Sequence, residues 1–382
     1  MTAPIDFAAI RAREFPIGER IAYLDHATVS PMPVRTAAVL AERVAALQDP
    51  SREHGLRAAY AIEARERMGR LLNAPPQQIA LLSNLAEAAA VVANGLTLEP
   101  GDEIVIPEQE FSSLVYPWLN LEAHGVRVVF VPKTGPATDF ERIVAALSPR
   151  TKALALSHVE FQNGFRHDMV ELGELCRRHG ILFFVDVTQS LGILPIDVVA
   201  WQADVVAAHG YKWMMALHGI AALYVSEAAM AKIRPTVPGR SSVTGGFELL
   251  DYALDWHPDA RRYQSGGPNW LGAAAIAASL SLVEEIGIEN VAKRAKAVSD
   301  RILAGLTDMP VEIATDLRPE HRSSILTFTS GSEEKDRALV AAARTADIHV
   351  GRRGMGVRTA ASFWNNGVDA DRLLDVVRAQ LK

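Results

Sequence analysis

Short apolar runs alternate with amphipathic stretches through the middle of the chain, and this alternation is the main indication of its fold. Each run contains few polar residues, so we expect both faces of each strand to be buried. Strands that alternate with helical stretches are typical of a mostly parallel sheet with helices on both faces. The seven predicted strands are Ile79–Leu82, Glu103–Ile106, Val126–Val131, Lys152–Ser157, Ile181–Val187, Asp204–Ala208 and Ile220–Val225, and the predicted helices between them include Glu87–Leu96, Phe140–Leu147 and Met169–His179.

The C-terminal third follows an irregular, Gly- and Pro-containing connection at Pro235–Pro258. The elements predicted beyond it are an Ala-rich helix at Asn269–Ile286, strands near Ser324–Thr329 and Gly356–Ala361, and helices near Glu333–Ala346 and Asp369–Leu381, with Asp369 as the N-cap of the last helix. The chain is therefore predicted to be an α/β protein. Residues 31–250 form its large domain, residues 251–382 a smaller α+β domain, and residues 1–30 a separate N-terminal segment.

Composition narrows the class of protein. The proportions of hydrophobic residues (49%) and charged residues (22%) are ordinary for a globular enzyme. A net charge of −6 without a basic block argues against nucleic acid or an anionic membrane as a partner. The N-terminus has no long apolar core, so we expect neither a signal peptide nor a membrane anchor. The one cysteine, Cys176, cannot form an internal disulfide, which favours a cytoplasmic location, and the 11 histidines form no metal-ligand cluster.

An acid and a lysine follow two of the predicted strands. Asp186 ends the run Ile-Leu-Phe-Phe-Val, and Lys212 lies in His209-Gly-Tyr-Lys212-Trp213, just after the next strand. Open α/β sheets bind ligands at the carboxyl ends of their strands, so these side chains are expected to face each other across a crevice. A partly desolvated lysine forms Schiff bases readily. We therefore interpret Lys212 as the anchor of pyridoxal 5′-phosphate and Asp186 as the partner of its ring nitrogen.

Each of these residues also has a simpler interpretation. Most lysines are solvated surface charges, and an aspartate after a strand often caps the next helix. Gln189 either caps the same turn or donates a hydrogen bond to the phenolic oxygen of the cofactor. Its fixed spacing from Asp186 favours the second role.

The motifs Asp186-x-x-Gln189-Ser190-x-Gly192 and His209-Gly-Tyr-Lys212-Trp213 closely resemble those of the class V aminotransferase family. This group includes cysteine desulfurases, isopenicillin N epimerase-like proteins and kynureninase. The resemblance extends along nearly the whole chain. Further matching segments are Tyr23-Leu-Asp25-His26-Ala-Thr, the stretch Arg261–Gly267 with Pro268-Asn269, and Arg353-Gly-Met-Gly-Val-Arg358.

The resemblance implies fold type I, pyridoxal phosphate as cofactor, and a homodimer with the active site at the subunit interface. It also implies that the N-terminal segment packs on the active site and the small domain. Small-molecule amino acids are then the expected substrates.

The resemblance also implies a set of cofactor contacts. Phe111 matches the aromatic residue that stacks on the pyridine ring. His209 and Tyr211 match positions that contact the phosphate, although Tyr211 is equally typical of a core residue. Leu85 and Ala86 open a helix where relatives often have hydroxyl residues, so main-chain amides would bind the phosphate there. Gly267 stands where relatives commonly have a threonine that reaches the phosphate of the neighbouring subunit.

Four residues are candidates on the substrate side. Arg358 matches the arginine that binds the substrate α-carboxylate, although an ordinary ion pair with a C-terminal acid is the simpler interpretation. His26 is expected near the substrate carboxylate. His158 and Asn163 lie in the family loop Ser157–Gly164, where His158 either moves protons or supports the cofactor.

The sequence leaves the reaction type open. A persulfide-forming desulfurase needs a mobile, reactive thiol, whereas Cys176 lies on the apolar face of a predicted helix and His349–Gly354 contains no cysteine. The sequence therefore disfavours a desulfurase and predicts an aminotransferase or a C–S or β-lyase. An epimerase, a kynureninase-like hydrolase and a non-catalytic binding protein with this fold remain alternatives.

Overall fold

The computed structural model describes residues 5–49, 51, 56–136, 138–246, 250 and 252–381. Its largest element is a seven-stranded sheet with the strand order β2-β8-β7-β6-β5-β3-β4. The strands are β2 (Ile79–Leu82), β3 (Glu103–Pro107), β4 (Arg127–Val131), β5 (Thr151–Ser157), β6 (Leu182–Asp186), β7 (Val205–His209) and β8 (Ala221–Val225). All seven strands were predicted from the sequence, which confirms the α/β fold.

The sheet is mostly parallel. β4, β3, β5, β6 and β7 pair in parallel, whereas β8 runs antiparallel to both of its neighbours. Parallel strands bring their carboxyl ends to one edge, so the residues after β5, β6 and β7 collect there. This edge holds the segments that contain Asp186 and Lys212.

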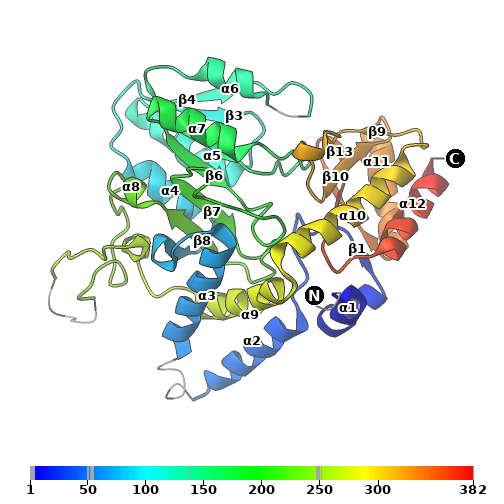
Figure 1. Cartoon of the computed structure of the whole chain (residues 1–382), viewed down its shortest axis with the longest axis horizontal. Helices are drawn as coiled ribbons and strands as arrows, with labels where there is room; N and C mark the ends of the chain where they lie inside the picture. Colours follow the sequence, from blue (N-terminus) through cyan, green and yellow to red (C-terminus); the bar gives the residue numbers. More distant parts are fainter. Residues whose placement is uncertain are drawn as a thin grey trace.

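Helices cover both faces of the sheet (Figure 1). The helices of the chain are α1 (Phe7–Glu14), α2 (Val34–Ala46), α3 (Leu56–Leu72), α4 (Leu85–Gly95), α5 (Ser112–Leu119), α6 (Phe140–Ala146), α7 (Met169–His179), α8 (Glu227–Met230), α9 (Trp270–Ile286), α10 (Ile288–Leu306), α11 (Glu333–Thr345) and α12 (Gly367–Gln380). Leu182 and Phe184 of β6 belong to a core with α4 and α5, whereas Phe183 and Val185 belong to a core with α3, α7 and α9. Successive residues of β6 thus face opposite layers, as the period of a strand requires.

A smaller sheet lies on the other side of the molecule, with α11 and α12 (Figure 1). Its strand order is β12-β13-β10-β9, with β9 (Glu312–Ile313), β10 (Ile325–Thr329), β12 (Gly351–Arg353) and β13 (Gly356–Ala360). All three pairings are antiparallel, which confirms the predicted α+β character of this part of the chain.

The predicted N-cap of α12 was wrong. The cap is Asn366, whose side chain accepts hydrogen bonds from the backbone N–H groups of Val368 and Asp369. Asp369 instead lies in the first turn and accepts a hydrogen bond from the backbone N–H of Asn366, which completes a capping box. The helix consequently starts earlier than predicted.

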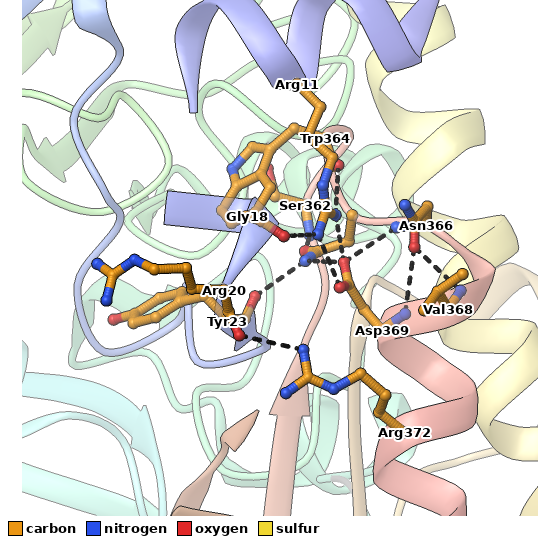
Figure 2. A network of polar contacts seen from close by, with 11 residues as sticks. Arg11, Gly18, Arg20, Tyr23, Ser362, Trp364, Asn366, Val368, Asp369 and Arg372 are labelled. Atoms are coloured by element: carbon orange, nitrogen blue, oxygen red, sulfur yellow. Dashed lines mark hydrogen bonds and ion pairs between the residues drawn. The ribbon is translucent and has the colours of Figure 1, made fainter. Parts of the chain in front are cut away.

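The N-terminal segment crosses to the C-terminal part of the chain. β1 (Ala22–Tyr23) pairs in parallel with β11 (Ile348–His349). Figure 2 shows the polar network beside this pair, in which Arg11 of α1 binds the Asp369 carboxylate with Nη2–Oδ1 at 2.9 Å. This contact holds the N-terminal segment against α12. Asp25 and His26 follow β1 in the same segment.

The division of the chain at residues 30 and 250 stays a prediction. α9, which lies beyond residue 250, packs against α2 and α3. Among the described residues no single helix is long and apolar enough to cross a membrane. α9 and α10 meet that test only as a pair, and they are bent by 82° relative to each other.

Candidate active site

Lys212 is buried at the carboxyl edge of the large sheet. It lies in the turn that follows β7, and its side chain is 6% exposed. Burial lowers the pKa of its amine to about 8, although the Asp186 carboxylate acts in the opposite direction. About a tenth of the amine is therefore uncharged at pH 7, and the uncharged amine is the form that attacks an aldehyde.

An aromatic ring faces this amine. Phe111 precedes the first residue of α5, and its ring centroid lies 5.2 Å from the Nζ atom of Lys212. Phe161 packs edge-on against the same ring, with 5.3 Å between the centroids. The ring is thus held beside the lysine, in a position where it can cover a planar group attached to that nitrogen.

Asp186 ends β6 on the face of the sheet that α4 and α5 cover. Its Oδ1 atom accepts a hydrogen bond of 2.7 Å from the backbone N–H of Thr188. Burial raises the pKa of the carboxyl, while the bonds from Thr188 and the charge of Lys212 oppose that shift. A buried carboxylate needs a cationic or N–H partner, and a protonated pyridine nitrogen is such a partner.

The Gln189 amide contacts the protein at both ends. Its nitrogen donates to the carbonyl oxygen of Ala27 at 3.0 Å, and its oxygen accepts from the indole N–H of Trp213 at 2.9 Å. Gln189 therefore ties the segment after β6 to the lysine turn. Gly192 permits this approach, because its φ is +101° and a Cβ atom there would lie 2.5 Å from the Trp213 carbonyl oxygen.

The N-terminus of α4 offers free backbone donors. The Asn84 side chain caps the helix through the N–H of Glu87. The N–H groups of Leu85 and Ala86 donate to no other described residue, as is usual for a first helical turn. Those two amides are suited to a phosphate.

Two aromatic side chains follow β7. The ring of Tyr211 is stacked on that of His218, with 3.8 Å between centroids, and lies 4.9 Å from that of His209. Burial lowers the pKa of His209 to about 4, so its ring is neutral at physiological pH. Gly267 lies farther along the chain and is exposed, and a Cβ atom added there would meet the Trp270 side chain at 3.7 Å.

Arg358 is a fully buried guanidinium on β13, with 1% of its surface exposed. Its Nη1 atom donates to the Phe161 carbonyl oxygen at 2.6 Å, and its Nη2 atom donates to Asp25 Oδ1 at 3.1 Å and to Thr28 Oγ1 at 2.7 Å. Its Nε–H has no partner among the described residues. Burial lowers the pKa of Arg358 to about 10, so the group stays charged at neutral pH.

The structure does not bring all of the predicted residues together. His26 is completely buried, and its ring centroid lies 5.8 Å from that of Trp213. His158 packs against Trp201, with ring centroids 4.6 Å apart, on the face of the sheet opposite to Asp186. The Asn163 side chain bonds the carbonyl groups of Pro136 and Ala314 and the backbone N–H of Phe165, so it supports a loop.

Glu110 is a residue that the sequence analysis missed. Its carboxylate is buried and accepts two bonds from Ser157, from the backbone N–H at 2.6 Å and from the hydroxyl at 2.5 Å. Ser157 is paired with Asp186 in the sheet, and Phe111 follows Glu110 directly. Burial and the nearby acids Glu160 and Asp186 raise the pKa of Glu110 well above its usual value. The sequence feature that could have indicated Glu110 is its position directly before Phe111, the predicted stacking residue.

The single cysteine, Cys176, does not have the properties of a catalytic thiol. Cys176 is 1% exposed on α7, within the core that includes Leu172 and Leu175. Burial raises the pKa of its thiol to about 12. Such a thiol is inert toward nucleophilic chemistry. Among the described residues, no group of His, Cys, Asp and Glu is arranged to hold a metal ion.

Comparisons with known proteins place the chain in a family. A model of the family "Aminotransferase class-V" matches residues 22–368. A probable cysteine desulfurase of Methanothermobacter thermautotrophicus is 29% identical, over 83% of this chain and 80% of the relative. Isopenicillin N epimerase of Streptomyces clavuligerus is 26% identical, over 83% of each chain. The chain belongs to the class V aminotransferase family.

A solved structure confirms the fold type I architecture. It is a mutant of the enzyme C-DES with glycine covalently linked to its pyridoxal phosphate cofactor. It matches with a TM-score of 0.87 and 22% identity, over 98% of this chain and 99% of that chain. Pyridoxal phosphate is the cofactor of this family.

Proposed function

We propose that this protein is a pyridoxal phosphate-dependent enzyme that acts on an amino acid as an aminotransferase or as a C–S or β-lyase. The observation that carries the proposal is the buried amine of Lys212. It has a lowered pKa, an opposing carboxylate at Asp186 and the ring of Phe111 at 5.2 Å. These three groups match the aldehyde, the ring nitrogen and the ring face of the cofactor.

The remaining contacts fit the phosphate and the ring substituents. The backbone amides of Leu85 and Ala86 are the main donors that we assign to the phosphate. We also assign His209 and Tyr211 to it, and Gly267 to the phosphate of the neighbouring subunit. The amide nitrogen of Gln189 has a second hydrogen besides the one bonded to Ala27, which suits the phenolic oxygen. We assign the cofactor site to these residues together with Lys212, Asp186 and Phe111.

The cofactor supplies an aldehyde for amines and a ring that accepts electrons from Cα. With the cofactor bound, the Asp186 carboxylate would hold a proton on the ring nitrogen, which would strengthen that electron acceptor. The Lys212 amine, whose pKa burial lowers to about 8, would take the proton from Cα and would return it to Cα or to another atom of the substrate, according to the reaction type. Arg358 binds the α-carboxylate, which orients the Cα–H bond toward the lysine. His158 and Asn163 contribute by supporting the loop after β5, and His26 by supporting Trp213.

The thiol chemistry of the chain favours this choice over a desulfurase. Relatives of the chain are described as probable cysteine desulfurases. A persulfide-forming enzyme needs a reactive thiol at the substrate, but Cys176 is buried with a pKa of about 12. The hairpin of β12 and β13, which carries Arg358, contains no cysteine. One solved relative is described as a cystine C–S lyase, which is within the class that we propose.

Epimerisation is the second candidate, because one relative is an isopenicillin N epimerase. It needs only that the proton returns to the other face of Cα. Kynureninase-like hydrolysis and a non-catalytic binding role remain alternatives, and product analysis distinguishes them from epimerisation.

Cofactor binding is tested with the purified protein stripped of ligands. Added pyridoxal phosphate should produce a visible absorption band, and Lys212→Ala should not produce it. Because the uncharged amine is the attacking form, the rate of band formation should rise with pH through about 8. Wild-type protein that forms no band with saturating cofactor would refute the proposal.

The reaction type is tested by incubating the loaded enzyme with amino acids, with and without a keto-acid acceptor. A keto product that needs the acceptor identifies an aminotransferase. Pyruvate with ammonia or sulfide, released without an acceptor, identifies a lyase. Exchange of the Cα proton with inversion and no other product identifies an epimerase. A band shift without any product identifies a binding protein.

We also propose that the enzyme is a homodimer with the active site at the subunit interface. Gly267 is exposed, at the position where the resemblance implies a contact with the neighbouring subunit, and symmetric dimers are the most common oligomers. Sedimentation velocity should give about twice the monomer mass of 41.4 kDa, and a monomer at micromolar concentration would contradict the proposal.

A further inference from the structure

Two guanidinium groups lie side by side at the candidate substrate site. Arg353 ends β12, and Arg358 lies on the neighbouring strand β13. The Nη2 atoms of both residues donate to the same oxygen, Thr28 Oγ1, at 2.6 Å for Arg353 and 2.7 Å for Arg358. Thr28 is exposed and the Arg353 side chain is half-buried, so Arg353 is partly accessible to solvent beside the buried Arg358.

The cluster of Arg353, Arg358, Thr28 and Asp25 has two positive charges and one negative charge. Arg358 is paired with Asp25, to which Thr28 also donates a hydrogen bond of 2.9 Å. Gly351 makes room for this carboxylate, because a Cβ atom there would lie 2.8 Å from Asp25 Oδ1. Within the described part of the chain, Arg353 meets no carboxylate. It donates only to Thr28 and to the Arg352 carbonyl oxygen. One positive charge is left over.

The surplus charge is close to the reactive amine. Arg358 and Arg353 both lower the pKa of Lys212, and Arg353 lowers that of Arg358. The half-buried Arg353 side chain reaches Thr28, whose hydroxyl oxygen also binds Arg358, so its charge lies beside that of Arg358. Its neighbour Arg352 has the opposite orientation and pairs with Glu333 of α11, with Nη2–Oε1 at 2.6 Å.

We infer that Arg353 binds a second anionic group of the substrate, so that the enzyme prefers amino acids with a carboxylate or sulfinate side chain. This inference rests on the proposed function, in which Arg358 binds the α-carboxylate. An arginine binds a planar anion through two parallel hydrogen bonds. An acidic side chain at Arg353 would neutralise the charge that Asp25 leaves uncompensated, which a neutral side chain cannot do.

The test compares Arg353→Gln with the matched control Arg352→Gln, which removes the same charge from the adjacent residue. Calorimetry measures the binding of succinate and of butyrate. Neither ligand reacts, and neither needs the cofactor. Arg353→Gln removes the cation that pairs with the second carboxylate of succinate, so the affinity for succinate should fall by roughly ten- to a hundredfold. The affinity for butyrate should stay within about twofold of wild type. Arg352→Gln should leave both ligands within about twofold of wild type, because Arg352 pairs with Glu333.

The second arm uses the loaded enzyme and follows the shift of the visible band. Aspartate, glutamate and cysteine sulfinate should shift the band at lower concentration than alanine in wild type, and Arg353→Gln should remove that preference. Arg353→Lys should restore part of it, because the charge returns without the two-pronged geometry. Thermal unfolding midpoints show that each variant is folded.

Each outcome decides one of the two proposals. Equal loss of succinate and butyrate in Arg353→Gln means that both arginines serve one carboxylate, and it overturns the inference. A visible band without any preference for acidic amino acids also overturns it, while the proposed function stands. Failure of the band in wild type refutes the proposed function instead, whatever the succinate result.

Discussion

At the scale of single residues, the candidate site combines groups that the sequence singled out with groups that it did not. Lys212, Asp186 and Phe111 lie together because strand ends and a helix start meet at one edge of the sheet. His158 does not join them. Ser157 and Asp186 are register partners on one face, so the next residue turns to the other. Register depends on pairing between distant segments, which one sequence does not reveal.

Other residue contacts could not be predicted from the sequence either. The bond between Glu110 and Ser157 joins positions 47 residues apart, and the pair Asp25–Arg358 joins positions 333 apart. The sequence motif contained Asp25, but nothing in it indicated which cation the carboxylate would meet. The chemistry of the residues was thus predictable, whereas their partners were set by the fold.

Glu110 should make stability depend on pH. Its pKa is raised in the folded protein, mainly by burial, so above the usual value of 4.5 the unfolded chain releases a proton that the folded chain keeps. The free energy of unfolding then falls as pH rises, by at most about 1.4 kcal/mol per pH unit, until the folded pKa is reached. Glu110→Gln keeps the contacts to Ser157 and removes this fall. Urea denaturation between pH 5 and 8 measures it.

The exposed Glu122 provides the control for Glu110, because Glu122→Gln changes the same group without burial. Its unfolding curve should follow that of the wild type at every pH. Parallel pH profiles for wild type and Glu110→Gln would show that Glu110 is already ionised in the folded protein.

At the scale of elements, the apolar pattern predicted all seven strands of the large sheet within about two residues. It also predicted α7 with its observed ends. In the structure, Asp168 caps the start and Gly180 ends the helix in the left-handed region. α10 was missed although Val291, Ala295, Val298 and Ile302 are spaced as a helix requires. Only Gly287 separates α10 from α9, and a connection of one residue gives little indication in the sequence that one helix ends and another begins.

The cap of α12 illustrates a misplaced boundary. Asn366 and Asp369 both have the chemistry of an N-cap, and their spacing of three is that of a capping box. The residue at the start of such a pair is the cap, and the residue at its end lies in the first turn. Reading Asp369 as the cap therefore placed the start of the helix about one turn late.

Replacing the cap should weaken α12. Asn366→Ala removes the acceptor for the N–H groups of Val368 and Asp369, so the free energy of unfolding should fall by about 1 kcal/mol. Asn366→Ser keeps an acceptor and should lie within about 0.5 kcal/mol of wild type. Urea denaturation of the two variants decides this. An equal loss in both would mean that Asn366 acts through packing rather than as a cap.

At the scale of the whole molecule, the two ends of the chain meet beside the candidate substrate site. Arg11 binds Asp369, and Arg372 bonds the carbonyl oxygen of Arg20 (Figure 2). Asn365 bonds the carbonyl oxygen of Tyr23. The N-terminal segment then continues to Asp25, the partner of Arg358. Contacts between the chain ends therefore position a residue of the site.

Breaking the contact between Arg11 and Asp369 should loosen this arrangement. The Asp369 side chain is 1% exposed and that of Arg11 13%, so Arg11→Ala leaves a buried carboxylate without its cation. We expect the free energy of unfolding to fall by about 3 kcal/mol. Arg13 of the same helix is 52% exposed, and Arg13→Ala should cost at most about 0.5 kcal/mol.

Amide hydrogen exchange tests whether the effect reaches the site. The N–H groups of Ala22, Leu24 and His26 bond Asp347, His349 and Ala360 across the two ends of the chain. Arg11→Ala should speed exchange at these three amides relative to those of β6, because the segment loses an anchor while the large sheet is unaffected. Uniformly faster exchange throughout the chain would instead indicate global destabilisation. Unchanged exchange at all three amides would show that Asp25 is positioned without the Arg11 contact.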